Sequence, residues 1–381
     1  MPVFNGKNVP NEIFSKIVMK LDGRSLHTAR QVCQDWNSAI KGEVLGTVEG
    51  RREMERTLQH QWREATPARL EFTPGDQAEV LTINDPFAVL YSYSDPDSEM
   101  LHHADMIRVV NIMEGVEVME VLCSAGPLAT GALLTKDVLL LVRCSDEESE
   151  VLAWVHTGEQ IFNKKFPPGT GTVVFDYHHQ QVMLGRSTRL EISGDTIIET
   201  NQPPIPGSGD LRVFSHPYYI TREPSHTSSL WKIDGITIVQ LSAELAAVGR
   251  GELVFCHDIL ILCEWFPWSE MSLRIFNSLT GQIINGRFLD LPIKISGITF
   301  NANQLVVCGS QRSNDQDQEI LLLYELEALL SHQDISPRVF EISQPGFISK
   351  IYLNDTSINM VMEDDDDEMK IITLDFWSCE N

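Results

Sequence analysis

The residues of this sequence that could do chemistry are two histidine pairs, seven cysteines and one glycine-rich segment. The histidine pairs lie in segments 102–105 (HHAD) and 176–179 (DYHH), and neither has a nucleophile or a further metal ligand at a recognised spacing. The cysteines form no Cys-x-x-Cys pair, and segment 203–210 lacks the Lys and the following Ser or Thr of a phosphate-binding loop. We therefore predict no catalytic residue, no cofactor site and no metal site, and a protein that is not an enzyme.

Charge divides the chain into two unequal parts. Residues 1–65 contain 10 Lys or Arg and 8 Asp or Glu, whereas residues 66–381 contain 19 and 46, a net charge of −27. Such an acidic part argues against nucleic acid as a partner and makes basic proteins better candidates. The N-terminal residues lack the apolar run of a signal peptide, no run is long enough to cross a bilayer, and the scattered cysteines argue against a disulfide framework. These features predict a cytoplasmic or nuclear protein without a membrane partner.

Residues 8–40 have the pattern of two short amphipathic helices. Pro10 fixes the backbone φ at a helix start, and apolar residues then recur at three- and four-residue spacing as far as Leu21. Asp22-Gly23 ends this helix, and Ser25 can cap a second helix with its own apolar stripe. A module of about 35 residues cannot bury enough surface to be stable alone. We therefore expect it to require a partner surface.

Ten positions of this stretch resemble the F-box family in fixed order. The family pattern is Leu-Pro-x-Glu-Ile, then an apolar helix, then Leu-x-x-Ala-x-x-Val-Cys-x-x-Trp, and Val9 stands where Leu is usual. The matching positions are Pro10, Glu12, Ile13, Ile17, Leu21, Leu26, Ala29, Val32, Cys33 and Trp36. The alternative from pattern alone is a helical hairpin that packs on the main domain.

The resemblance implies an all-α F-box domain at residues 1–45 that docks onto the Skp-type adaptor of a cullin-based ubiquitin ligase. The residues that it places at the adaptor are Val9, Pro10, Ile13, Ile17, Leu21, Leu26, Val32, Cys33 and Trp36. After this domain, residues 46–66 are predicted to form a helical connector. Met54, Leu58 and Trp62 fall four residues apart on one face, and arginines alternate with acids on the others.

From residue 67 onward a unit of strands recurs about every 45 residues, within the range of propeller blades. Each unit has an apolar first strand, a very apolar second strand, a polar loop, a third strand and, after a turn, a fourth. Seven units can be traced, with second strands predicted at Phe87–Tyr93, Asp137–Arg143, Gln181–Gly185, Tyr218–Thr221, Asp258–Glu264, Gln304–Ser310 and Ser357–Glu363. Segment 319–333 (EILLLYELEALLSHQ) fits either a helix or a strand followed by a helical turn.

This pattern resembles a WD-repeat-like β-propeller at residues 67–381, although the Gly-His and Trp-Asp signatures of that family are absent. Seven blades fit the spacing best, with six or eight blades or a β-sandwich as alternatives. The chain ends after the third strand of the last unit, whereas the segment at about 68–74 is a spare strand. We therefore expect this segment to pair into the last blade and close the ring.

The loops between second and third strands share one face of such a propeller, and their compositions differ. Four contiguous units have acidic loops at 94–99, 145–150, 313–319 and 363–368, and another unit has the aromatic loop EWFPWSE at 264–270. The predicted substrate-binding residues on this face are Arg186, Arg189, Arg222, Trp265, Phe266, Trp268, Asp364 and Asp365. The alternative for Trp265 and Trp268 is burial over the blade, and for the acidic loops it is a role in solubility.

These features predict a non-catalytic substrate receptor. The F-box would dock on the adaptor, and the propeller would hold a protein substrate close to the ubiquitin-transferring core. The alternative is a propeller scaffold whose F-box serves another assembly and whose partner is not degraded.

Overall fold

The computed structural model of the chain describes residues 3–4, 7–8, 62–63, 65–74, 78–92, 104–124, 129–135, 137–144, 149–166, 173–176, 180–202, 204, 210–222, 228–234, 237–245, 250–256, 259–265, 270–301, 303–313, 316–331, 336–342, 346–354, 356–364 and 368–376. The chain forms two compact units. One consists of Met1–Leu70, Asp355–Ile358 and Thr373–Asn381, and the other of Glu71–Asn354 and Asn359–Ile372.

In the first unit, a two-residue strand pair joins β1 (Val3–Phe4) and β2 (Lys7–Asn8). Trp62, one of the three residues on the predicted connector face, is buried and contacts Phe376, with ring centroids 4.3 Å apart. The Phe376 amide donates a hydrogen bond to the Thr356 carbonyl oxygen at 3.0 Å. The helices predicted within residues 8–40, and most of the connector, lie outside the described residues.

Seven four-stranded sheets follow along the chain, each with its strands in order from the first to the fourth. The first sheet contains β4 (Ala78–Asn84), β5 (Phe87–Ser92), β6 (Ala104–Asn111) and β7 (Val116–Ser124). The second contains β8 (Ala129–Leu134), β9 (Val138–Cys144), β10 (Ser149–Val155) and β11 (Gln160–Phe166). The third contains β12 (Val173–Asp176), β13 (Gln181–Leu184), β14 (Thr188–Ser193) and β15 (Thr196–Asn201).

The remaining four sheets have the same internal order. The fourth contains β16 (Asp210–Ser215), β17 (Tyr218–Arg222), β18 (Ser228–Asp234) and β19 (Thr237–Leu245). The fifth contains β20 (Arg250–Cys256), β21 (Ile259–Trp265), β22 (Glu270–Asn277) and β23 (Ile283–Asp290). The sixth contains β24 (Lys294–Phe300), β25 (Gln304–Ser313), β26 (Gln316–Glu325) and β27 (Arg338–Ile342). The seventh contains β28 (Phe347–Leu353), β29 (Ser357–Glu363), β30 (Met369–Asp375) and β3 (Ala68–Phe72).

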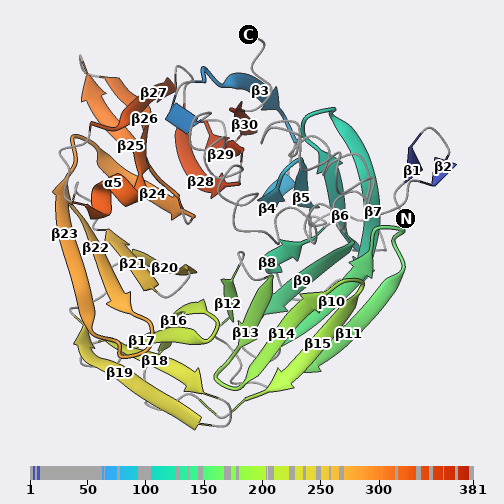
Figure 1. Cartoon of the computed structure of the whole chain (residues 1–381). Coiled ribbons are helices and arrows are strands. Elements are labelled where there is room, and N and C mark those ends of the chain that lie inside the picture. Colours follow the sequence, from blue (N-terminus) through green and yellow to red (C-terminus); the bar gives the residue numbers. More distant parts are fainter. Residues whose placement is uncertain are drawn as a thin grey trace. The chain divides into compact units, whose positions relative to one another are not determined.

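These sheets are the blades of a seven-bladed β-propeller. In the second unit of the chain, the first strands of neighbouring sheets contact one another, from β4 and β8 onward to β24 and β28. Figure 1 shows these first strands towards the centre and fourth strands such as β11, β15 and β23 on the outside. The circuit is completed where Lys350 on β28 donates a hydrogen bond to the Val80 carbonyl oxygen on β4 at 2.7 Å.

The apolar core lies between neighbouring blades, because the middle strands are apolar on both faces. Every residue of β9 except Cys144 is buried. Its alternate side chains contribute to two clusters, so that Leu139 and Leu141 pack against the first blade while Leu140 and Val142 pack against the third. Strands that are apolar on both faces are typical of sheets covered on both sides.

Several predictions of the strand pattern are confirmed. All seven predicted second strands are observed, within one residue at their starts. The strand β3 lies beside β30 in the seventh sheet, as expected for the segment at about 68–74. Segment 319–333 contains the end of β26 followed by the short helix α5 (Leu326–Leu330), which is the second of the two structures that the sequence allowed.

Candidate functional site

The residues predicted to contact the adaptor all lie outside the described part of the chain. They are Val9, Pro10, Ile13, Ile17, Leu21, Leu26, Val32, Cys33 and Trp36. Their roles therefore remain predictions.

The arginines predicted to bind substrate belong to the third and fourth blades. Arg186 is half-buried in the turn between β13 and β14, and Arg189 lies on β14 with its side chain only 14% exposed. Arg189 forms an ion pair with Glu191 at 3.7 Å. Arg222 ends β17, and its side chain is outside the described residues. Arg189 is therefore less accessible than the predicted role requires, whereas Arg186 keeps part of its surface exposed.

The aromatic loop of the fifth blade is shorter than its sequence pattern suggested. Trp265 is the last residue of β21 and is 8% exposed. It belongs to the apolar cluster between the fifth and sixth blades, together with Met271 and Leu291. Of the two possibilities for Trp265, the structure shows burial. The strand continues one residue further than predicted, and the ring packs towards the sixth blade. Phe266 and Trp268 lie outside the described residues.

Glu264, immediately before Trp265, is a buried carboxylate. Its side chain is 1% exposed and its Oε2 lies 2.6 Å from a guanidinium nitrogen of Arg274. Burial raises the pKa of Glu264 above its usual value, and the positive charge of Arg274 opposes this only in part. The folded state therefore binds a proton more readily than the unfolded state at this position.

A pH-dependent stability follows for Glu264. Because its folded pKa is the higher one, its contribution to the free energy of unfolding decreases as the pH rises from about 4.3, the usual pKa of a free glutamate, through the folded pKa. The Glu264→Gln variant lacks this titration. We expect the stability of the variant relative to the wild type to increase between pH 4 and pH 7 in chemical denaturation experiments. A relative stability that is constant or decreases over this range would contradict the raised pKa.

Two of the acidic loops are also shorter than predicted, because strands extend into them. Glu150 lies on β10 and forms a buried ion pair with Arg143 on β9, with a hydrogen bond of 3.1 Å from the Arg143 Nε to the Glu150 Oε2. Glu319 lies on β26 and is buried.

In the seventh blade, Asp364 follows β29 and accepts a hydrogen bond from the Glu368 amide at 2.9 Å, while Asp365 is outside the described residues. Among the described residues, Arg189, Trp265 and Asp364 are on three different blades, and their joint role in substrate binding stays a prediction.

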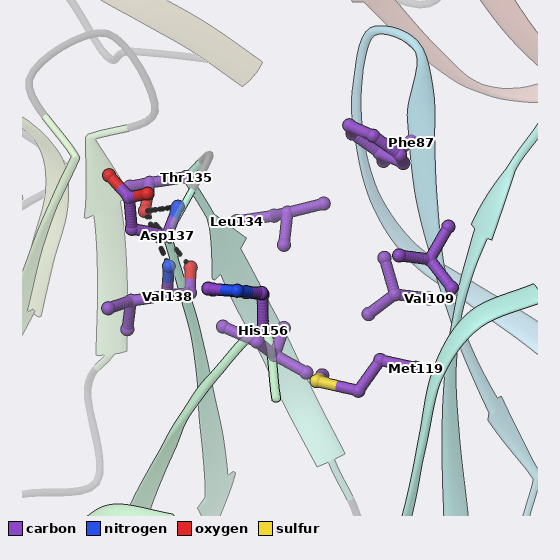
Figure 2. Close-up of a pocket in the computed structure, with 10 residues that line it drawn as sticks. Phe87, Val109, Met119, Leu134, Thr135, Asp137, Val138 and His156 are labelled. Atoms are coloured by element: carbon purple, nitrogen blue, oxygen red, sulfur yellow. Dashed lines mark hydrogen bonds between the residues drawn. The ribbon is translucent and has the colours of Figure 1, made fainter. Parts of the chain in front are cut away.

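A pocket that the sequence analysis did not predict lies between the first two blades. It has a volume of about 50 Å³ and is lined by residues from both sheets: Phe87, Val109, Val118, Met119, Leu134, Thr135, Asp137, Val138, Leu139 and His156. Figure 2 shows Leu134 and Met119 extending into the space between the sheets, together with His156. Most of this lining is apolar.

The walls of the pocket are held by hydrogen bonds. The Asn84 side chain donates to the Leu134 carbonyl oxygen at 2.7 Å, which joins the first blade to the second. The Thr135 hydroxyl accepts hydrogen bonds from the amides of Val138 at 2.9 Å and Asp137 at 3.3 Å, and the His156 amide donates to the Asp137 carbonyl oxygen at 3.1 Å. The β8–β9 turn is therefore fixed before any ligand arrives.

A β-bulge determines which side chains of β7 line the pocket. Val109 pairs with Met119 and Val110 pairs with Glu117, so Val118 is the additional residue. Such a bulge redirects one side chain of a strand. As a result, two consecutive residues, Val118 and Met119, both line the pocket, although a regular strand would point them to opposite faces.

This arrangement is suited to binding rather than to covalent chemistry. The Thr135 hydroxyl, the nearest candidate nucleophile, also donates to the Val138 carbonyl oxygen at 3.1 Å and is committed to its turn. The described part of the chain contains no group of three or more His, Cys, Asp or Glu side chains that could hold a metal ion. In the same residues, no helix is long and apolar enough to cross a membrane.

Comparison with known proteins gives a family only for the N-terminal segment. Residues 7–47 match the family model of the F-box domain. No curated protein matches the chain in sequence. Among solved structures, the β-propeller domain of the Trilobed protease from Pyrococcus furiosus is 8% identical, with 78% of this chain and 95% of that chain covered and a TM-score of 0.50. BamB from Moraxella catarrhalis is 10% identical, with 77% and 83% covered and a TM-score of 0.43.

The chain thus combines an F-box domain at residues 7–47 with a seven-bladed β-propeller. At 8% identity, the likeness to the Pyrococcus furiosus domain is one of fold alone. F-box domains generally bind Skp-type adaptors, and both parts are typical of non-catalytic interaction modules.

Proposed function

We propose that this protein is the substrate-recognition subunit of a ubiquitin ligase built from a Skp-type adaptor, a cullin and an F-box protein. The observation that carries the proposal is the F-box match at residues 7–47 in the same chain as a propeller. The F-box docks on the adaptor, and the propeller binds a protein substrate. The subunit itself performs no catalytic step.

The mechanism is proximity. A substrate held by the propeller meets the activated ubiquitin at a high effective concentration, because both are parts of one assembly. Rigid elements suit this role, and the blades are joined by hydrogen bonds between neighbours. The Tyr218 hydroxyl of the fourth blade donates to the Ser278 carbonyl oxygen of the fifth at 2.8 Å, and Arg287 of the fifth donates to the Leu329 carbonyl oxygen of the sixth at 3.1 Å. The proposed location of the assembly is the cytoplasm or the nucleus.

The test compares the full chain with a chain that lacks residues 1–65. Both are expressed with an affinity tag, and bound proteins are identified with and without proteasome inhibition. The full chain is expected to bind the adaptor and cullin, the shortened chain to lose both, and a shared partner to accumulate on inhibition only where the full chain is present. If the partner's level does not respond, the protein is a scaffold. If the adaptor is not bound, the proposal is wrong.

A further inference from the structure

The pocket between the first two blades lies at the end of the blades that bears the turns between first and second strands. Its lining includes the β8–β9 turn, with Thr135 and Asp137, and His156 in the β10–β11 turn. In an antiparallel blade, these turns lie at the opposite end from the loops between second and third strands. The pocket is therefore distinct from the acidic and aromatic loops on which the sequence analysis placed substrate binding.

The shape and lining of the pocket limit what can occupy it. Apolar side chains from two sheets form most of its wall, so water inside it has few hydrogen-bond partners. A volume of about 50 Å³ has room for the terminal methyl groups of one aliphatic side chain and excludes a large cofactor. Val118 at its edge is 50% exposed, which leaves further apolar surface for the backbone or stem of the occupant.

Among the described residues, the charges around the pocket are mostly negative. Asp137 is part of the lining, and Glu117 and Glu159 adjoin the lining segments and are exposed. Lys136 lies outside the described residues, and Arg108, which precedes Val109, directs a guanidinium nitrogen to the Pro74 carbonyl oxygen at 3.4 Å. An apolar cavity with an acidic border favours an apolar side chain with positive neighbours.

We infer that this pocket binds an extended segment of a substrate protein in which one Leu, Ile or Val is flanked by Lys or Arg. The aliphatic side chain fills the space between Met119 and Leu134, and the basic side chains lie near Glu117, Asp137 and Glu159. This inference rests on the proposed function in that the segment belongs to the substrate. It names the class of substrate.

The experiment measures binding of defined synthetic peptides to the full-length chain by fluorescence anisotropy. The peptides have Leu, Ile, Val, Ala or Asp at the centre, with two Lys or Arg, two Ser or two Glu on each side. We expect saturable binding of the Leu, Ile and Val peptides with basic flanks, an affinity roughly tenfold or more lower for Ala at the centre, and a decrease in affinity as salt is raised. Absence of binding by every peptide, or a preference for Glu flanks, would overturn the inference.

Two variants on the same strand connect the binding to this pocket. Val118→Asp places a charge at its edge, whereas Leu122→Asp changes a residue that is 67% exposed and does not line it. Because both positions are at least half exposed, both variants should fold, which thermal unfolding verifies. We expect Val118→Asp to weaken peptide binding about tenfold or more and Leu122→Asp to change it less than about twofold. Equal losses in the two variants would contradict the assigned site.

The peptide measurement requires no adaptor. If the chain binds the peptides but not the adaptor, the proposed ligase role is wrong and the assignment of the pocket stands. If the chain binds the adaptor but none of the peptides, the assignment of the pocket is wrong and the ligase role stands.

Discussion

The variants Ile13→Asp and Leu26→Asp are expected to lose binding of the Skp-type adaptor, with a decrease in affinity of at least about 100-fold. Both positions lie within residues 7–47, which match the F-box domain, and belong to the apolar pattern that resembles this family. A carboxylate at such an interface must be desolvated without a partner, which costs several kcal/mol, and about 2.7 kcal/mol corresponds to a factor of 100. The measurement is co-purification of the variants with the adaptor, followed by titration.

The matched control is Lys16→Asp, which introduces the same side chain at a position outside the apolar stripe of the same predicted helix. We expect this variant to bind the adaptor within a few-fold of the wild type. All three variants should leave the chemical denaturation of the propeller unchanged, as monitored through tryptophan fluorescence. If Ile13→Asp and Leu26→Asp bind the adaptor normally, these two residues do not contact the adaptor as predicted, even if the F-box match holds.

The propeller could be predicted from the sequence because its second strands carry a local signal. Segments such as 137–143 (DVLLLVR) and 357–363 (SINMVME) are short apolar runs that recur at a nearly constant period, and covered strands require such runs. The position of β3 in the seventh sheet followed from counting strands at the two ends of the pattern. Both inferences use local properties of the sequence, namely short apolar runs and their order along the chain.

The site features that were missed depend on contacts between distant residues. The pocket requires Val109 and Leu134 to face one another across two blades, and it requires the bulge at Val118. Neither the register of β6 with β7 nor the spacing of two sheets can be read from the order of residues. The single available signal was the run Val116–Ser124 (VEVMEVLCS), in which apolar side chains also occupy exposed positions of an outer strand.

A large loss of stability is expected when one partner of the buried ion pair beside the second acidic loop is removed. Arg143 and Glu150 are directly opposite on β9 and β10, and their side chains are almost fully buried. Arg143→Met removes the positive charge and leaves the carboxylate of Glu150 in an apolar setting. We expect the free energy of unfolding to decrease by about 3–5 kcal/mol, as for other buried pairs that lose one partner. Chemical denaturation at pH 7 measures this change.

The double variant Arg143→Met/Glu150→Leu removes both charges and should recover at least half of that loss, because no buried carboxylate remains. The control is the exposed pair of Lys164 and Glu199, joined at 2.7 Å between the second and third blades, for which Lys164→Ala should cost less than about 1 kcal/mol. If the double variant were as unstable as Arg143→Met, the packing of the arginine stem would be the cause, rather than the charge of Glu150.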